Sequence, residues 1–506
     1  MTTGDAAPGA RTVDPRRLAT TPGYADTARI DQLRAAEYPQ LDRDGQVYLD
    51  YAGAGVAARA QLAAHHDRLL SGLYSNPHSE NASSAAAGAL VESARRAVLE
   101  FFRADPGEYA VIFTPNASGA CRLVGEAYRF GRAAPLVLTW DNHNSVNGIR
   151  EYARRAGAPV KYVPLAGPDL RVAERDVVAA LDGGRGPLAA VRGTGLARGA
   201  GLARGGGRRG LFAYPAQSNF TGVQHPLGWV DLARRHGYDV LLDAAAYAPT
   251  NRLDLSAVRP DFVCLSWYKL FGYPTGVGAL LARREALARL RRPWFAGGTI
   301  RAVSVQGGWH QPMADESGFE DGTLNFLSIP DVEFGLRWLD SIGVELIHAR
   351  VGLLTGWLLD RLAGLRHRTG QPLVRIYGPP TAAGRGGTVA LNLQRPDGSL
   401  VDERLVARDA AEAGFALRTG CFCNPGAGEA AFGIGRRSLR DALLPHVGTI
   451  DAYLEALRLP TGGAVRVSFG LASTAADAER FIDFVSATYL DRSGPTDVPL
   501  APRLRC

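Results

Sequence analysis

Two cysteines one residue apart, Cys421 and Cys423, lie in the stretch LRTGCFCN at residues 417–424. Such a pair can bind a metal, form a disulfide or supply a nucleophile. A zinc site needs two further cysteines or histidines at ligand spacing, and the sequence near this stretch contains no second pair. A disulfide between the two would close a very small, strained ring. A nucleophilic thiol and a buried structural cysteine therefore stay open at this point.

A second candidate for chemistry is Lys269, in the apolar and aromatic stretch SWYKLFGY at residues 266–273. The chain has only two lysines, Lys161 and Lys269, against 55 arginines (57 − 2). Arginine stays protonated, whereas a desolvated lysine can lose its proton and form an imine. A lysine in a chain that otherwise uses arginine suggests that an amine is needed at that position. Lys161 lies in an ordinary strand pattern, however, and for Lys269 the usual alternative is a surface lysine.

The elements that position these residues follow an alternating pattern. From about residue 85 to 290, helical segments alternate with short apolar runs, which is typical of a parallel α/β sheet. Ligands bind at the carboxyl ends of the strands in such sheets. Five polar groups are expected at that edge: Ser118, His143, Asn219, Asp243 and Lys269. After Asp331 a helical stretch to about residue 367 leads to a second lobe, with strands near 387–393 and 463–469, and the two cysteines lie there.

A lysine at one strand end and an aspartate at another suit pyridoxal phosphate. The amine forms an imine with the aldehyde, and the carboxylate pairs with the ring nitrogen. His143 could stack on the ring, and the helix start at Asn116-Ala117-Ser118 offers backbone N–H groups to a phosphate. Each residue also has an ordinary interpretation: Asp243 as a helix N-cap, His143 as a loop histidine and Ser118 as a plain cap.

Composition favours an ordinary globular protein, since 46% of the residues are hydrophobic and 21% are charged. The N-terminus lacks an apolar signal core, and the odd number of cysteines argues against a secreted disulfide scaffold. We therefore expect a cytoplasmic protein with no membrane segment. Six arginines and no acidic residue lie in the Gly/Arg-rich stretch 183–210, which leaves +1 of the net charge of +7 to the rest of the chain (7 − 6). We interpret this stretch as a disordered insertion rather than an RNA-binding loop, so we expect no nucleic-acid partner.

Several motifs, spread in order over residues 45 to 490, resemble those of one family. The sequence resembles the fold-type I, class V aminotransferases, within them the cysteine desulfurases, and most closely the amino-terminal desulfurase domain of molybdenum cofactor sulfurases. The resemblance rests on YLDYAGA at 48–54, NPHS at 76–79, PAQSNFTG at 215–222, LDAAA at 242–246, SWYKLFGYPTG at 266–276, FEDGT at 319–323, LRTGCFCN at 417–424 and AVRVSFG at 464–470.

The resemblance implies pyridoxal phosphate as the cofactor and gives each candidate a role. Lys269 would hold the cofactor as an imine, Asp243 would meet its pyridine nitrogen, and His143 would stack on its ring. The phosphate would be bound by Ala117, Ser118, Ser266 and Tyr268, and the ring oxygen by Gln217 or Asn219. Thr299 would reach the phosphate of the neighbouring subunit, because these enzymes are homodimers with shared sites. The substrate would meet Arg466 through its carboxylate, assisted by Arg418 and Asn76.

Cys423 stands at the position of the family's nucleophile, the third residue after the glycine of its RTG motif. The implied activity is an L-cysteine desulfurase that releases alanine and carries sulfur as a persulfide on Cys423. Catalysis would then involve Lys269, Cys423 and His143, with no metal. The role of Cys421 stays open between a structural cysteine and a relay of sulfur. Another class V reaction, such as transamination, epimerisation or carbon–sulfur lysis, is the alternative, but transamination and epimerisation need no thiol.

The expected architecture is α/β: a large domain with a mostly parallel seven-stranded sheet, and a smaller C-terminal α+β domain. We expect a disordered tail over 1–24, the large domain over 25–340 with its N-terminal segment packed on the small domain, the small domain over 341–490, and a tail over 491–506. The sulfur acceptor could be molybdenum cofactor, a separate protein or a small biosynthetic molecule. Ala246 stands where many cysteine desulfurases have a glutamine. At this position the chain is similar to the sulfurase branch.

Overall fold

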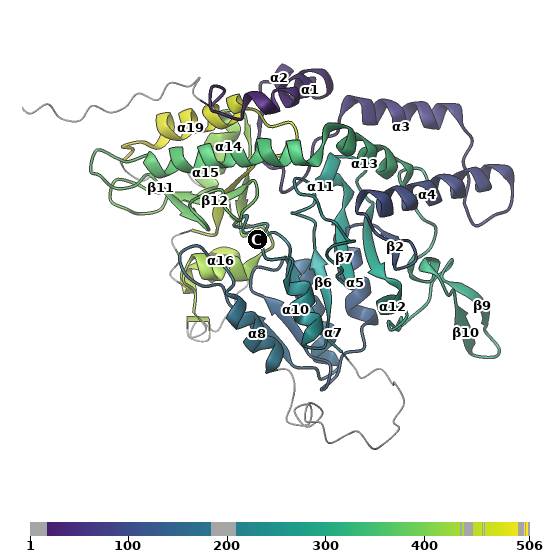
Figure 1. Ribbon diagram of the computed structural model, residues 1–506. Helices are drawn as coiled ribbons and strands as arrows, with labels where there is room; N and C mark the ends of the chain where they lie inside the picture. The colour runs from purple at the N-terminus through teal and green to yellow at the C-terminus, as the bar shows by residue number, and fades with distance from the viewer. Residues whose placement is uncertain are drawn as a thin grey trace, which may run out of the picture.

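The computed structural model describes residues 18–183, 209–435, 438–439, 449–457, 459, 461–493, 500 and 502–503. The expected insertion at 183–210 lies almost wholly outside the described residues, as does Cys506. Two domains lie side by side in Figure 1, the larger with a broad central sheet and the smaller with the C-terminal elements.

The large domain is built on a seven-stranded sheet in the order β2-β8-β7-β6-β5-β3-β4. Only β8 runs antiparallel to its neighbours, which confirms the mostly parallel sheet expected from the sequence. The strands are β2 (Tyr109–Thr114), β3 (Leu136–Thr139), β4 (Val160–Val163), β5 (Gly210–Pro215), β6 (Tyr238–Asp243), β7 (Phe262–Ser266) and β8 (Gly278–Arg283).

Helices cover both faces of this sheet, because the strands are apolar on both sides. Alternate residues of each strand enter two separate hydrophobic clusters, as the period of two in a strand requires. One face packs on α4 (Ala82–Phe101), α8 (Glu174–Asp182), α10 (Trp229–Arg235) and α13 (Pro330–Ile342). The other face packs on α5 (Ala117–Ala127), α7 (Ile149–Arg155) and α12 (Arg284–Leu287).

The small domain contains an antiparallel four-stranded sheet in the order β11-β12-β15-β14. Its elements are α14 (Val344–Gly364), β11 (Val374–Tyr377), β12 (Thr388–Leu393), α15 (Glu403–Glu412), β13 (Phe415–Ala416), β14 (Arg418–Gly420), α16 (Pro425–Ala431), α18 (Ile450–Ala456), β15 (Ala464–Ser468) and α19 (Ala475–Tyr489). The helical stretch expected after Asp331 is broken, because Gly343 takes a φ of +96° between α13 and α14.

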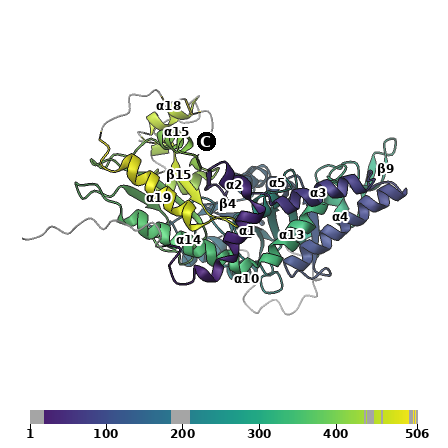
Figure 2. The same ribbon diagram turned by 90° about the horizontal axis from the view of Figure 1, so that it is seen from above.

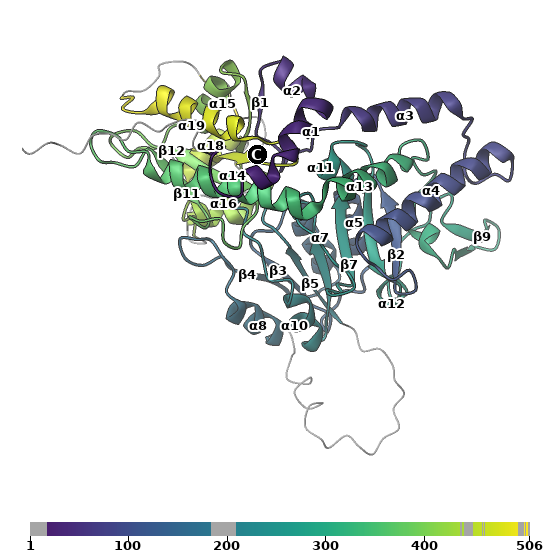
Figure 3. The same cartoon turned by 45° about the horizontal axis from the view of Figure 1, so that its top comes forward.

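The N-terminal segment crosses back onto the small domain. It contains α1 (Arg29–Glu37), α2 (Pro39–Arg43) and β1 (Val47–Tyr48), and β1 pairs in parallel with β13. Figure 3 shows α1 beside α14. Residues 18–24 were expected to be part of a disordered tail, and this is corrected by the structure: Leu18 is fully buried, and the Tyr24 hydroxyl accepts hydrogen bonds from Arg350 and the Ala475 N–H.

Two further elements extend from the large domain. Helix α3 (Arg59–Ser71) lies alongside α4, and a hairpin of β9 (Ile300–Ser304) and β10 (Trp309–Pro312) projects at the same end of the molecule, as Figure 2 shows for α3, α4 and β9. Both carry exposed apolar side chains. Within the described residues no single helix is long and apolar enough to cross a membrane; α13 and α14 pass that test only as a pair bent by 69°.

Candidate active site

The carboxyl ends of the large-domain strands surround a hollow of about 430 Å³. Its lining contains the predicted cofactor residues from several different strand ends, which the parallel order of the sheet brings to one edge. These are Ala117, Ser118, His143, Gln217, Asn219, Asp243, Ser266, Tyr268 and Lys269. The structure therefore brings together every predicted cofactor residue except Thr299.

Lys269 lies in the short helix α11 (Trp267–Phe271), which begins where β7 ends. Burial lowers the pKa of its amine, and the nearby charge of Arg466 lowers it further, while Asp243 and Asp50 act in the opposite sense. A lowered pKa increases the fraction of neutral amine, which is the nucleophilic form. Lys161 lies away from this hollow, beside the C-terminal end of α8, where a cation is favourable.

Asp243 ends strand β6, the direct neighbour of β7 in the sheet. Its Oδ1 accepts a hydrogen bond of 3.0 Å from the Ala245 N–H, but the segment after it forms a turn, so the helix N-cap considered from the sequence is not found. The residue nevertheless lines the hollow together with Lys269. A carboxylate can accept several hydrogen bonds, so the bond within this turn leaves Asp243 able to accept another from a ligand.

His143 caps the short helix α6 (Asn144–Asn147) through its ring. Its Nδ1 accepts from the Ser145 N–H at 3.1 Å, so the neutral ring carries its proton on Nε2. Burial lowers the pKa of His143, and the nearby Lys269 charge lowers it further. A neutral ring at the edge of the hollow suits stacking on an aromatic ligand.

The hollow has one end suited to an anion. Helix α5 begins there, capped by Asn116, and the Ala117 N–H donates to Ser266 Oγ at 3.2 Å. The hydroxyl of Ser118 contacts that of Ser145. Several hydroxyls at the start of an 11-residue helix are groups suited to binding a phosphate. Sequence reasoning missed Ser145 and Thr275, which line the same hollow. The position of Ser145, two residues after His143, could have indicated that it lies at the same edge of the sheet.

Gln217 and Asn219 are both buried, and their amides are already engaged. Gln217 Nε2 donates to Ala246 O at 3.0 Å, and Asn219 Nδ2 donates to Phe422 O at 2.8 Å. With these bonds between described residues, each amide nitrogen keeps a second N–H for a ligand.

Two arginines face each other on neighbouring strands of the small domain, with Arg418 of β14 opposite Arg466 of β15. Arg466 is buried; its Nη2 donates to Asp50 Oδ1 at 2.7 Å and its Nη1 to Asn219 O at 3.1 Å. Among the described residues its Nε has no hydrogen-bond partner. Burial lowers the pKa of Arg466. The side chain of Arg418 is 55% exposed and lies 4.0 Å from Asp50.

Cys423 is a free, half-buried thiol in the loop between β14 and α16. Its carbonyl accepts from the Asn144 N–H at 2.7 Å, which places the residue next to His143. As a thiolate it would raise the pKa of Lys269. Cys421 is disulfide-bonded in the structure, and because Cys423 is free the two are not joined. Cys121 and Cys264 are buried, with their Sγ atoms 3.5 Å apart.

Five predicted site residues are not part of the lining of the hollow. Arg466, Arg418 and Cys423 belong to the small domain beside it, whereas Thr299 and Asn76 lie elsewhere in the large domain. Thr299 is buried, with its Oγ1 donating to Ala296 O, and lines a separate hollow of about 470 Å³. Asn76 is exposed and donates to Thr323 Oγ1 at 3.3 Å. Neither residue can therefore contact a ligand in the hollow of the same chain without a rearrangement. Among the described residues no cluster of three or more histidine, cysteine, aspartate or glutamate side chains could hold a metal ion.

The sequence model of the class-V aminotransferases matches residues 47–178 and 207–481. The chain is 36% identical over 494 residues to a molybdenum cofactor sulfurase of Solanum lycopersicum, covering 92% of this chain and 58% of that protein. It is 34% identical over 520 residues to a molybdenum cofactor sulfurase of Homo sapiens, covering 97% of this chain and 55% of that protein. The chain thus spans less than two thirds of the length of these curated relatives.

Solved structures with the same fold include an apo cysteine desulfurase from Thermococcus onnurineus NA1, with a TM-score of 0.71 and 21% identity, covering 90% of this chain and 97% of that one. A cysteine desulfurase from Escherichia coli gives a TM-score of 0.68 at 21% identity, covering 90% of this chain and 98% of that one. At these identities the likeness establishes the fold.

Proposed function

Because the chain belongs to the class-V aminotransferase family, a family of the pyridoxal-phosphate-dependent fold, we propose that it is a desulfurase that takes sulfur from L-cysteine. The observation that carries the proposal is the pairing of two features. The hollow joins Lys269, Asp243 and His143, and a free thiol at Cys423 lies next to it.

The residues of the hollow fit pyridoxal phosphate by the chemistry of their donors. Serine hydroxyls and the start of α5 suit the phosphate, a carboxylate suits the ring nitrogen, and an amine of lowered pKa suits the aldehyde. We assign the phosphate to Ala117, Ser118, Ser145 and Ser266, the ring nitrogen to Asp243 and the aldehyde to Lys269. When bound, the cofactor supplies an electron sink for bonds at the substrate α-carbon.

The protein's own residues perform the remaining tasks. Arg466 binds the substrate carboxylate, using the Nε that has no partner among the described residues. Lys269 Nζ accepts the proton from the substrate α-carbon. The neutral His143 ring would stack on the ring of the bound cofactor, and it holds its own proton on Nε2.

Cys423 then takes the sulfur. Its thiolate attacks the sulfur of the substrate, a bond forms between the two sulfur atoms, and the bond from that sulfur to the β-carbon breaks. The β-carbon takes up a proton, Lys269 Nζ returns a proton to the α-carbon, and the product leaves as alanine, so Cys423 keeps a persulfide. The relatives are named for molybdenum cofactor, which makes that cofactor our first candidate acceptor, ahead of another small molecule or an acceptor protein.

We further propose that the protein works as a homodimer in which Thr299 and Asn76 complete the site of the partner subunit. This is supported by their positions outside the hollow of their own chain. It is also supported by exposed apolar side chains on the projecting hairpin and the segment before it, namely Trp294, Phe295, Val303, Val305 and Trp309.

The first experiment is incubation of the purified holoenzyme with L-cysteine and no reductant, followed by peptide mapping and alanine assay. We expect one added sulfur on Cys423 and release of alanine. Cys423→Ala should keep the yellow absorbance of the cofactor but accumulate no persulfide, whereas Lys269→Ala should lose that absorbance as purified. Cofactor absorbance without added sulfur or alanine would contradict the desulfurase and point to another class V reaction.

A further inference from the structure

The backbone that carries the nucleophile is strained. Phe422 and Cys423 have φ values of +56° and +53°, in the left-handed region that residues other than glycine rarely adopt. Such a conformation persists only where the surroundings hold it. The carbonyls of both residues accept hydrogen bonds from the large domain, Phe422 O from Asn219 Nδ2 at 2.8 Å and Cys423 O from the Asn144 N–H at 2.7 Å. Two successive peptide groups are therefore held.

The next residue, Asn424, is fully buried and joins three parts of the molecule. Its Nδ2 donates to Asp141 O at 2.8 Å and to Asn219 Oδ1 at 2.9 Å, which uses both N–H groups. Its Oδ1 accepts from the Ala427 N–H at 3.2 Å and so caps α16. One amide thus connects the Cys423 loop to the segment before His143 and to Asn219.

The loop is also packed tightly against its surroundings. A Cβ atom at Gly426 would lie 2.2 Å from Trp140 O, so the start of α16 lies directly against the end of β3. The ring of Phe422 is buried, with the Phe220 ring centroid at 5.1 Å and the Arg466 guanidinium 4.8 Å above it. Side-chain packing therefore reinforces the hydrogen bonds that hold the backbone.

We propose that Asn424 is a positioning residue that fixes the Cys423 loop against the large domain. Cys423 then receives sulfur and gives it up at one fixed place, beside His143 and Asn219, and the sulfur acceptor comes to it. The catalytic meaning of this hold rests on the proposed function, but the hold itself is a property of the resting protein and can be measured without turnover.

The test is the rate at which iodoacetamide alkylates Cys423 in the resting holoenzyme, followed by peptide mapping. Freeing a held loop raises the share of open states, so we expect Asn424→Ala to increase this rate about tenfold or more. Asn424→Asp keeps the oxygen that caps α16 but loses both N–H donors, and it should increase the rate to a similar extent. Asn81→Ala, which removes the asparagine cap of α4 far from the loop, should leave the wild-type rate.

Wild-type alkylation rates in both Asn424 variants would overturn the proposal. A wild-type rate in Asn424→Asp alone would also overturn it, because the cap of α16 would then suffice. With L-cysteine, Asn424→Ala should keep its KM while the rate of persulfide formation on Cys423 falls about tenfold. If the wild-type enzyme forms no persulfide at all, the desulfurase assignment fails, whereas the alkylation rates still report on the loop.

Discussion

At the scale of single residues, Arg466 is the most constrained charge near the hollow. It is a buried guanidinium between Asp50 and the Asn219 carbonyl, and its pKa is lowered by burial. A lysine could keep the charge but not the planar set of donors with which arginine binds a carboxylate at two points. Asp50 alone cannot satisfy those donors, since Nε is left over among the described residues.

We therefore predict that Arg466→Lys raises the KM for L-cysteine on the order of 10²-fold, as the loss of a bidentate contact of about 2–3 kcal/mol requires. Steady-state alanine release over a range of L-cysteine concentrations measures this. Arg418→Lys is the matched control, because the exposed Arg418 side chain should change KM only a few-fold. An unchanged KM in Arg466→Lys would show that the carboxylate binds elsewhere.

The residues of the hollow were largely predictable because each follows a short apolar strand, and strand ends of a parallel sheet meet. Lys269, Asp243 and His143 were found in this way. The role of Asn424 was not, because it depends on a backbone path that brings Phe422 and Cys423 into left-handed conformations. No local pattern in the stretch 417–424 signals that path, which comes from contacts with residues about 200 to 280 positions away.

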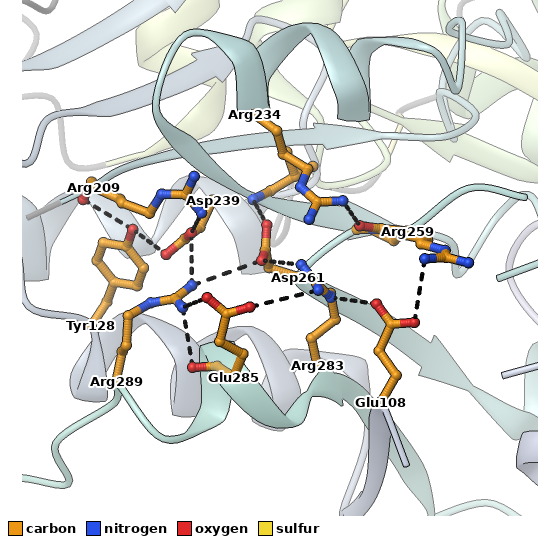
Figure 4. A network of polar contacts seen from close by, with 12 residues as sticks. Glu108, Tyr128, Arg209, Arg234, Asp239, Arg259, Asp261, Arg283, Glu285 and Arg289 are labelled. Carbon is orange, nitrogen blue, oxygen red and sulfur yellow. Dashed lines mark hydrogen bonds and ion pairs between the residues drawn. The ribbon is translucent and has the colours of Figure 1, made fainter. Parts of the chain in front are cut away.

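At the scale of elements, the large sheet has a charged network at the edge opposite the hollow. Asp239 lies near the start of β6 and Asp261 directly before β7, both buried. Figure 4 shows them among arginines, with Arg289 close to both carboxylates. Asp261 Oδ2 also accepts from the Val240 N–H at 2.9 Å. The amino ends of the strands thus serve stability, while the carboxyl ends serve chemistry.

Burial, together with the neighbouring Asp239, raises the pKa of Asp261 from 3.8 to about 6. A carboxyl group whose pKa is higher in the folded state stabilises the fold at pH values below about 4, and this contribution is lost as the pH rises through about 6. Asp261→Asn keeps an oxygen for Val240 and carries no charge. We predict that this variant has a free energy of unfolding up to about 3 kcal/mol higher than wild type at pH 8, with a smaller gain at pH 5. Urea unfolding at the two pH values measures this.

Asp239→Asn is the companion variant, since it breaks ion pairs with Arg209 and Arg289 and should destabilise the protein at both pH values. A gain for Asp261→Asn that does not change between pH 5 and pH 8 would show that the charge of Asp261 is not its cause. The elements themselves were mostly predictable, including a seven-stranded sheet that is mostly parallel. The break at Gly343 and the order of residues 18–24 were not, because both depend on packing between distant segments such as Tyr24 and Arg350.

At the scale of the whole molecule, one chain does not bring all the expected site residues together. Thr299 lines a hollow near the projecting hairpin, and Asn76 lies on an exposed loop between α3 and α4. The same end of the large domain carries exposed apolar side chains on α3 (Leu62, Leu69 and Leu70), just after it (Leu73) and on the hairpin. Exposed apolar groups of this extent indicate a contact with another protein surface. A two-fold dimer would cover them and bring a second copy of Thr299 to the first hollow.

This arrangement predicts subunit complementation. Lys269→Ala and Thr299→Ala, each weakly active or inactive alone, are unfolded together, refolded and assayed for alanine release. A mixed dimer would contain one site with Lys269 from one chain and Thr299 from the other, so the mixture should recover up to about a quarter of wild-type activity. Lys269→Ala mixed with Asp243→Ala is the control, because both residues line the same hollow and no mixed dimer restores it. Recovery in neither mixture, with dimers present by light scattering, would mean that Thr299 serves only its own chain.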